Sequence, residues 1–461
     1  MEIKILNKHY CLQLCIDTVF ISVSILLITI LTANQLDAQN NLTGVYKNYH
    51  AVQSAGSNEI LTARNQLQFQ FTRGFDRGNF QTDLNIVHRY DSGQQAEILL
   101  REVYFERYFS RTDLRIGKQK ILWGRANGGF ITDILSPVDL REFLTQDPED
   151  LRIGLTSINA TFYRGANSLQ FVLAPLFQKD LLPESTSRWF PVQTIESPLP
   201  VQFIDYDFNP TLKDVQLAFR YAFRNISWID LDVMGMRWKH PTPAYAIDIN
   251  LFDFPNLPSI SLKETYHNSI MGGFSATVQL SSDLFFITEA LYVHERLFPF
   301  LPVPISLVED ALTSVPSAIQ LLQEFELRDD GYLINKPWLN GMAGVQTEFF
   351  GTSLSAQIYL ETIFQYEEKI LSQQYFPYVT LLAARPFLRD RLQVLALSRY
   401  NFYAEDFWVQ LQGMYELSDG LELTVGTNLF AGDDFTPFYG HFTFSQYRQN
   451  SFLFARFALF F

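Results

Sequence analysis

The chain has 461 residues, of which 18% are charged and 15% are aromatic, and its formal net charge is -14. This negative charge argues against nucleic acid as a partner, because phosphate binding requires basic patches. Beyond residue 33, no apolar run approaches the roughly 18 residues that a membrane-spanning helix requires. The many Phe and Tyr side chains must therefore lie on other elements.

The first 38 residues predict a secretory signal. Two lysines precede an apolar stretch at 19–31, and Ala38 is a small residue that suits cleavage. A retained membrane anchor is the alternative interpretation. Both cysteines, Cys11 and Cys15, lie in this segment, so we expect the mature chain 39–461 to contain neither disulfide nor thiolate chemistry.

From residue 42 onward, apolar and polar residues alternate in segments of about ten residues, the length of a tilted membrane-spanning strand. In 66–72, for example, Leu67, Phe69 and Phe71 share one face and three glutamines share the other. The pattern predicts about 18 strands. In chain order they cover 42–51, 61–72, 79–90, 96–109, 113–122, 151–163, 168–177, 213–223, 227–239, 269–280, 283–297, 338–350, 352–367, 376–387, 391–400, 405–417, 420–431 and 451–461.

Short polar turns alternate along the chain with much longer connections. The long connections are 123–150, 178–212, 240–268, 298–337 and 432–450. This alternation is typical of an outer-membrane barrel with short periplasmic turns and long extracellular loops. We therefore expect residues 39–461 to form an all-β, antiparallel, up-and-down transmembrane barrel of about 18 strands, with 16 as the alternative.

The last strand carries an apolar face and a polar face. Alternate residues from Leu453 to Phe461 are apolar and suit lipid, whereas Arg456 falls on the opposite face and suits a wet lumen. The terminal Phe461 resembles the C-terminal signal that the barrel-assembly machinery recognises. We therefore expect this machinery, together with outer-membrane lipid and lipopolysaccharide, as partners.

The strand predicted at 96–109 conflicts with a simple alternation. Arg101 and Arg107 fall on one face, and Glu102 and Glu106 fall on the other. One pair would then face lipid, which is costly. Three solutions stay open: a position near an interface, pairing with a neighbour, or contact with an inserted loop.

The most distinctive stretch is RIGKQKILWGRANGGFITDILSPVDL, residues 115–140. It resembles the fingerprint of a family of largely uncharacterised, porin-like outer-membrane proteins. The matching positions are Arg115, Gly117, Lys118, Gln119, Trp123, Gly124, Asp133, Pro137 and Asp139. Elsewhere the resemblance extends only to barrel architecture, shared with alginate-export and substrate-specific porin barrels. The resemblance implies neither a catalytic activity nor a cofactor.

Within this stretch, alternation places Arg115 and Gln119 on the lumen side. Trp123 lies where the strand leaves the membrane, which predicts an interfacial girdle residue. Asp133 and Asp139, in the glycine-containing loop that follows, would bond the loop backbone or pair with Arg115. Two hypotheses stay open: a loop latch formed by Trp123, Asp133 and Asp139, or direct contact of these residues with a solute.

The predicted lumen holds charges of both signs. The basic residues are Arg64, Arg89, Arg115, Arg152, Arg220 and Arg456, and the acidic residues are Asp83, Asp230, Asp232, Glu361, Glu416 and Glu422. As candidate pore-lining or solute-contact residues we take Arg64, Arg115, Gln119, Arg220, Asp230, Asp232 and Arg456. Balanced charges predict a weak ion preference, although plain structural pairing is an alternative role.

Two long loops, 188–208 and 296–327, are rich in aromatic, proline and aliphatic residues. The second ends in a run from Ser317 to Leu327 that would form a short helix. These loops predict a packed cap over the barrel mouth. The alternative is a site for an apolar or sugar-like ligand that stacks on aromatic rings.

Enzymatic signals are weak. The histidines after residue 38 lack metal-ligand spacing, and His267 with Ser269 only loosely resembles the Ser/His pair of an outer-membrane phospholipase. We expect no catalytic residue, metal or cofactor. The sequence predicts an outer-membrane channel for passive passage or export of a small, carbohydrate or aromatic solute. The alternatives are a structural or adhesive barrel that displays its loops, or an outer-membrane hydrolase.

Overall fold

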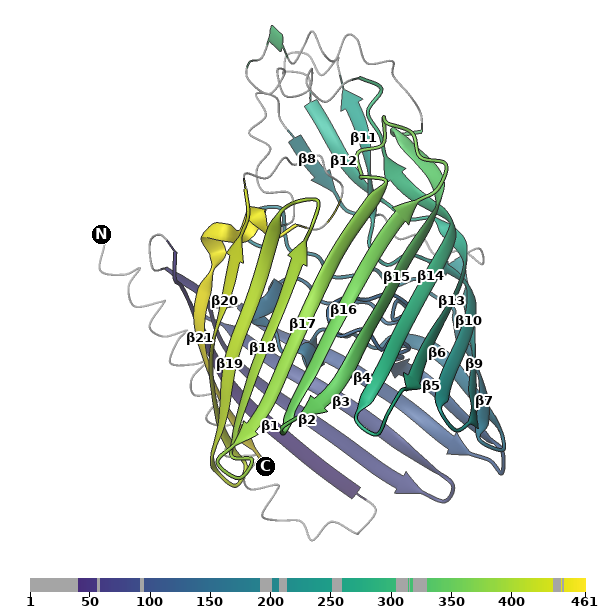
Figure 1. Ribbon diagram of the computed structural model, residues 1–461, viewed down its shortest axis with the longest axis vertical. Coiled ribbons are helices and arrows are strands. Elements are labelled where there is room, and N and C mark those ends of the chain that lie inside the picture. Colours follow the sequence, from purple (N-terminus) through teal and green to yellow (C-terminus); the bar gives the residue numbers. More distant parts are fainter. Residues whose placement is uncertain are drawn as a thin grey trace, which may run out of the picture.

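The structure, a computed structural model, contains a closed barrel of eighteen antiparallel strands (Figure 1). It describes residues 40–461 except 56–58, 92–94, 191–200, 207–213, 251–258, 304–313, 315, 318–329, 434–440 and 442. The barrel strands are β1 (Asn40–Gln53), β2 (Ile60–Phe75), β3 (Gly78–Arg89), β4 (Gln95–Tyr108), β5 (Thr112–Gln119), β6 (Leu155–Arg164), β7 (Asn167–Ala174), β9 (Gln216–Ile226), β10 (Ile229–Lys239), β13 (Asn268–Gln279), β14 (Leu284–Pro299), β15 (Leu333–Phe349), β16 (Thr352–Ile363), β17 (Tyr375–Phe387), β18 (Leu392–Asn401), β19 (Asp406–Ser418), β20 (Leu421–Ala431) and β21 (Phe452–Phe460).

Each barrel strand pairs with the next barrel strand along the chain, and β21 pairs with β1 to close the sheet. At this seam, the backbone N–H of Gly44 donates to the carbonyl of Phe461 at 2.7 Å, and Phe461 donates back at 2.9 Å. Closure matters because an unpaired strand edge in hydrocarbon costs several kcal/mol per unsatisfied group. The predicted 18-stranded barrel is confirmed, and the alternative of 16 strands is wrong.

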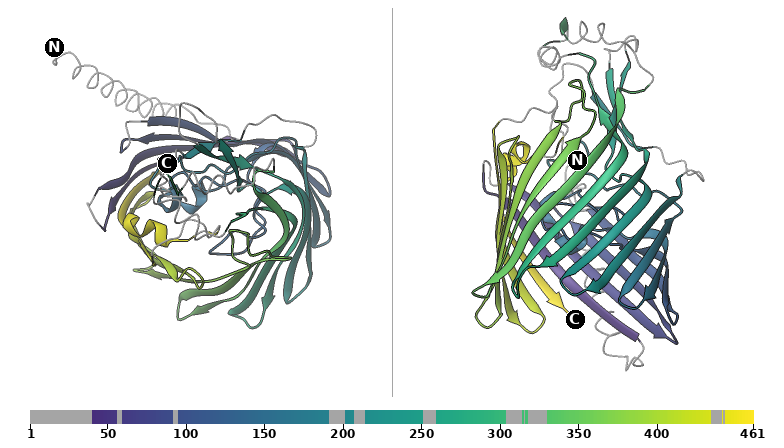
Figure 2. Two further views of the ribbon diagram at one scale, coloured as in Figure 1. Left: turned by 90° about the horizontal axis from the view of Figure 1, so that it is seen from above. Right: turned by 45° about the vertical axis from the view of Figure 1, so that its right-hand side comes forward.

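The two ends of the barrel differ in their connections. Tight turns such as 350–351 and 419–420 lie at the same end as Phe461, and most of the long connections lie at the opposite, extracellular end (Figures 1 and 2). No helix in the described part of the chain is long and apolar enough to cross a membrane. The predicted signal lies outside the described residues, as do most of loops 188–208 and 296–327 and all of the run Ser317–Leu327 except Ser317.

The extracellular connections contain a small second sheet that the sequence interpretation missed. It consists of β8 (Val201–Ile204), β11 (Ala244–Asn250) and β12 (Ser259–Thr265). β12 pairs antiparallel with β11 and parallel with β8. The sequence predicts long connections at 178–212 and 240–268, and three strands as short as these give too few alternating residues to stand out.

The outer face of the barrel is apolar and the inner face is largely polar near β1 to β5. On β9, Leu217 and Phe219 face outward and are 50% and 45% exposed, whereas Gln216 on the other face is 1% exposed. On β21, Leu453 and Leu459 are exposed as predicted, whereas Phe452 and Ala458 on the other face are buried. An apolar outer band of this kind is typical of bacterial outer-membrane barrels.

A β-bulge in β4 resolves the conflict in 96–109. The β3–β4 register shifts where Asp83 pairs with Glu102 and Leu84 pairs with Leu100, so Arg101 is the extra residue. A bulge leaves one residue unpaired and changes the phase of the side chains. Arg101 and Glu106 are consequently both buried inside, at 3% and 5% exposure.

Candidate functional site

The connection between β5 and β6, residues 120–154, folds into the barrel lumen (Figure 2). Its tip reaches strands well beyond its own: the Arg125 guanidinium donates to Asp232 on β10 at 2.9 Å and to Thr277 on β13 at 2.7 Å. The backbone N–H of Asn127 donates to Gln357 on β16 at 3.0 Å. We call residues 120–135 the crossing arm, because they traverse the lumen.

Glu289 on β14 anchors the crossing arm to the wall. This carboxylate is 1% exposed and accepts the backbone N–H of Arg125 at 2.8 Å and that of Thr132 at 2.7 Å. Gly128 lies so close to Thr380 on β17 that a Cβ atom would overlap it. The arm is therefore held by specific contacts and leaves little free space on this side of the lumen.

Trp123 belongs to the lumen and not to the membrane interface. It is 2% exposed, and its indole N–H donates to Gln170 at 3.0 Å. The guanidinium of Arg220 lies 5.5 Å from the ring centroid. The girdle prediction is wrong, because β5 ends at Gln119 and the chain turns inward before Trp123.

The two aspartates of the fingerprint pair within the loop region. Asp133 accepts the backbone N–H of Trp123 at 3.3 Å and forms an ion pair with Arg152. Asp139 forms an ion pair with Arg141 at 2.8 Å. Neither pairs with Arg115, whose guanidinium lies 2.6 Å from Glu106, its register partner on β4.

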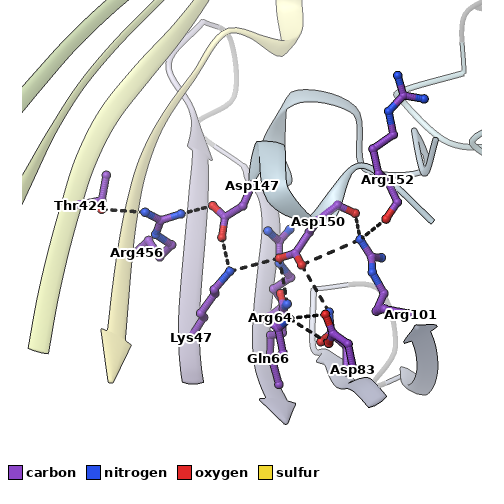
Figure 3. Close-up of polar contacts among 12 residues, drawn as sticks. Lys47, Arg64, Gln66, Asp83, Arg101, Asp147, Asp150, Arg152, Thr424 and Arg456 are labelled. Carbon is purple, nitrogen blue, oxygen red and sulfur yellow. Dashed lines mark hydrogen bonds and ion pairs between the residues drawn. The ribbon is translucent and has the colours of Figure 1, made fainter. Parts of the chain in front are cut away.

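The second part of the connection carries three carboxylates that meet inward-facing cations of the barrel wall. Figure 3 shows two of them, Asp147 and Asp150. The ion pairs join Glu142 to Arg64 and Arg89, Asp147 to Lys47 and Arg456, and Asp150 to Lys47 and Arg101. We call Glu142, Asp147 and Asp150 the acidic latch. It ties residues 142–150 to β1, β2, β3, β4 and β21.

Two carboxylates of the acidic latch, Glu142 and Asp150, are ionised at neutral pH. Burial alone would raise the pKa of Asp150, but Lys47 and Arg101 outweigh this effect and lower the pKa to about 2. Burial also opposes ionisation of Glu142, whose pKa is nevertheless lowered by Arg64 and Arg89. Buried charges are stable only when they are paired and hydrogen-bonded.

Sequence reasoning missed the acidic latch and one of its cations, Lys47, and left contact of Arg101 with an inserted loop as one of three open solutions. A signal was present in the segment 145–150, TQDPED, an acidic run in a loop beside strands with isolated inward-facing cations. Period-two alternation assigns faces only within strands, so it could not show which wall this loop contacts.

Among the described residues, one cavity inside the barrel has a volume of about 950 Å³, and we call it the vestibule. It lies between residues 142–150 and the inner faces of β17 to β21, β1 and β2. Thr43, Gly44 and Phe461 line it at the periplasmic end. The barrel lumen is thus divided into a filled half around the crossing arm and an open half that reaches the periplasmic rim.

An aromatic cluster borders the vestibule on its extracellular side. Its members are Tyr49, Phe143, Trp189, Trp408, Phe430, Phe444, Tyr447 and Phe452, with Ala51 and Leu61. The rings of Phe143 and Tyr447, from two different loops, stack with centroids 4.7 Å apart. Leu144, Leu397 and Phe454 line the vestibule and also pack against this cluster.

The predicted pore-lining residues occupy different environments. Arg456 lines the vestibule, whereas Arg64 is 5% exposed beneath Glu142 and Gln119 is fully buried beside Ser157 and Asn159. Arg115 is paired with Glu106 and Arg220 stacks on Trp123. Asp232 is bound by Arg125, and Asp230, near the periplasmic turn, lies 3.6 Å from Arg224. Direct solute contact by these residues stays a prediction.

Comparison with known proteins identifies the fold. No family model matches the chain, and no curated protein matches it. Among solved structures, OccAB3 of Acinetobacter baumannii is similar over 92% of this chain and 99% of its own, with 9% identity and a TM-score of 0.50. OccK3 (OpdO) of Pseudomonas aeruginosa matches over 92% and 95%, with 8% identity and a TM-score of 0.50. OccAB1 of Acinetobacter baumannii matches over 92% and 96%, with 8% identity and a TM-score of 0.50.

At these identities the likeness shows the fold. It supports the expectation of a porin-like barrel, while the family fingerprint at 115–139 and the relation to alginate-export barrels stay predictions. A closed barrel with an apolar outer band places the chain in a bacterial outer membrane.

Proposed function

We propose that the protein is an outer-membrane channel through which a small solute passes down its gradient, without catalysis. The vestibule carries this proposal, because a cavity of about 950 Å³ lies inside a closed barrel and reaches its periplasmic end. A carbohydrate or aromatic solute, contact with lipopolysaccharide, and recognition of Phe461 by the barrel-assembly machinery are parts of the same proposal.

A structural or adhesive barrel is the second candidate. The aromatic cluster favours it, because Phe143, Trp189 and Tyr447 pack together beside the vestibule at its extracellular side. A hydrolase receives no such support. Ser269 donates its hydroxyl to the backbone carbonyl of Glu295, and His267 lies 3.2 Å from the Glu295 carboxylate. These contacts do not place His267 as a base for Ser269.

Single-channel recording in planar bilayers tests the proposal with refolded protein comprising residues 39–461. We expect a small, steady conductance, because residues 120–154 occupy part of the lumen. We also expect a weak ion preference. Liposome swelling with sugars and aromatic acids then identifies which solutes pass. A complete lack of steady conductance and of solute-dependent swelling would exclude the channel and favour the display barrel.

A further inference from the structure

We infer that the vestibule is a binding site for an uncharged solute that has one apolar face and one hydrogen-bonding face. This inference rests on the proposed function and specifies the class of solute. It follows from three properties of the wall: an apolar strip, an adjacent row of amides, and a balance of charge.

The apolar strip lies on β17 and β18. Leu382 pairs with Leu397 across these strands, and Leu395 lies two residues along on the same face. All three side chains line the vestibule and are half-buried. A water-filled barrel interior is normally polar, so this leucine strip leaves apolar surface in contact with water. A solute that covers the strip gains hydrophobic free energy roughly in proportion to the apolar area removed from water.

Amide side chains lie directly beside the strip. In the β18–β19 register, Gln410 pairs with Leu397 and Gln412 pairs with Leu395. Gln68 and Gln70 on β2 also line the vestibule. A carboxamide offers two donor hydrogens and an acceptor oxygen without carrying charge. The wall can therefore bind hydroxyl groups of a solute whose ring or chain rests on the leucines.

The charges of the vestibule wall cancel. Its described lining contains two cations, Lys47 and Arg456, and two carboxylates, Asp147 and Glu422. Both cations are bound to Asp147. An anionic solute would have to displace Asp147 from its partners, whereas a neutral solute leaves these ion pairs intact. The wall therefore discriminates against anionic solutes.

Isothermal titration calorimetry on the protein in lipid nanodiscs tests this selectivity with three probes of similar size. Phenyl β-glucoside carries both an apolar ring and hydroxyl groups, phenyl β-glucuronide adds a carboxylate, and sucrose lacks the apolar ring. We expect phenyl β-glucoside to bind at least about tenfold more tightly than either of the others. Equal or tighter binding of the glucuronide would overturn the inference.

Two variants at one position locate the site. Leu395→Gln replaces part of the apolar strip with an amide, and we expect it to weaken phenyl β-glucoside binding about tenfold. Leu395→Met keeps an apolar side chain at this position and is expected to weaken binding by less than about twofold. If both variants fold, as judged by circular dichroism, and bind phenyl β-glucoside equally, the vestibule is not the site.

Conductance recorded on the same preparations separates this inference from the proposed function. Steady conductance without phenyl β-glucoside binding would refute the solute class and leave the channel intact. Binding that depends on Leu395, in a protein that neither conducts nor transports, would leave the site intact and refute the channel.

Discussion

Asp180 shows how one buried carboxyl group joins three extracellular connections. It lies between β7 and β8, is 2% exposed, and accepts the backbone N–H of Val138 at 2.8 Å. The hydroxyl of Thr242, which follows β10, donates to its second oxygen at 3.0 Å. The pKa of Asp180 is raised to about 6. Burial causes this rise, and its effect outweighs the lowering of the pKa by the two hydrogen bonds and by Arg152.

This raised pKa predicts a pH-dependent stability. The folded state binds the proton of Asp180 more tightly than the unfolded state does, so stability falls as pH rises from about 4 to about 6. The shift corresponds to at most roughly 3 kcal/mol. Asp180→Asn should remove this contribution, which thermal unfolding followed by tryptophan fluorescence between pH 4 and pH 7 would measure. Asp419→Asn, in the exposed β19–β20 turn, is the control. An unchanged pH dependence in Asp180→Asn would contradict the assignment.

At the scale of elements, the acidic latch determines where residues 142–150 lie. Its carboxylates neutralise cations on five strands, and removing one partner of a buried ion pair typically costs about 3–5 kcal/mol. Because the pKa of Asp150 is about 2 in the folded protein, its stabilising contribution is present above about pH 4, the unfolded value. The contribution is lost as pH falls toward the folded value.

The double variant Glu142→Gln with Asp147→Asn should loosen this segment. Arg64, Arg89 and Arg456 would lose the carboxylates that neutralise them, so we expect a higher single-channel conductance and a shift of the reversal potential toward anion selectivity. Glu422→Gln removes a vestibule carboxylate outside the acidic latch and serves as the control. Conductance and selectivity equal to those of the unaltered protein would show that the acidic latch does not hold the segment.

For the whole molecule, the strand alternation could be predicted because lipid and lumen impose opposite polarity on successive side chains. All eighteen barrel strands follow this pattern closely enough to be found from the sequence. The bulge at Arg101 could not be predicted from the sequence, because it depends on the pairing of Asp83 with Glu102 across two strands. The prediction that Trp123 lies at the membrane interface is wrong, because a tryptophan that follows a strand suits a packed lumen as well as a membrane interface.

The candidate site was less predictable than the barrel. The sequence predicts that the segment containing Asp133 and Asp139 folds into the barrel. It does not predict their ion-pair partners, Arg152 and Arg141. Which residues form the acidic latch depends on which strands residues 142–150 contact. Those contacts exist only once the whole barrel has closed. The vestibule likewise is defined by strands at both ends of the chain, β1 and β21, whose contact only closure creates.

Disulfide cross-linking tests most directly the central claim that residues 120–154 divide the lumen. The Asn127 Nδ2 lies 3.2 Å from the Ser355 Oγ on the far wall, and the sequence has no cysteine after Cys15. In membranes containing residues 39–461 with Asn127→Cys and Ser355→Cys, we expect an intramolecular disulfide on oxidation, seen as a gel shift that reductant reverses and that neither single variant shows. A folded barrel in which these two cysteines stay reduced would contradict the account.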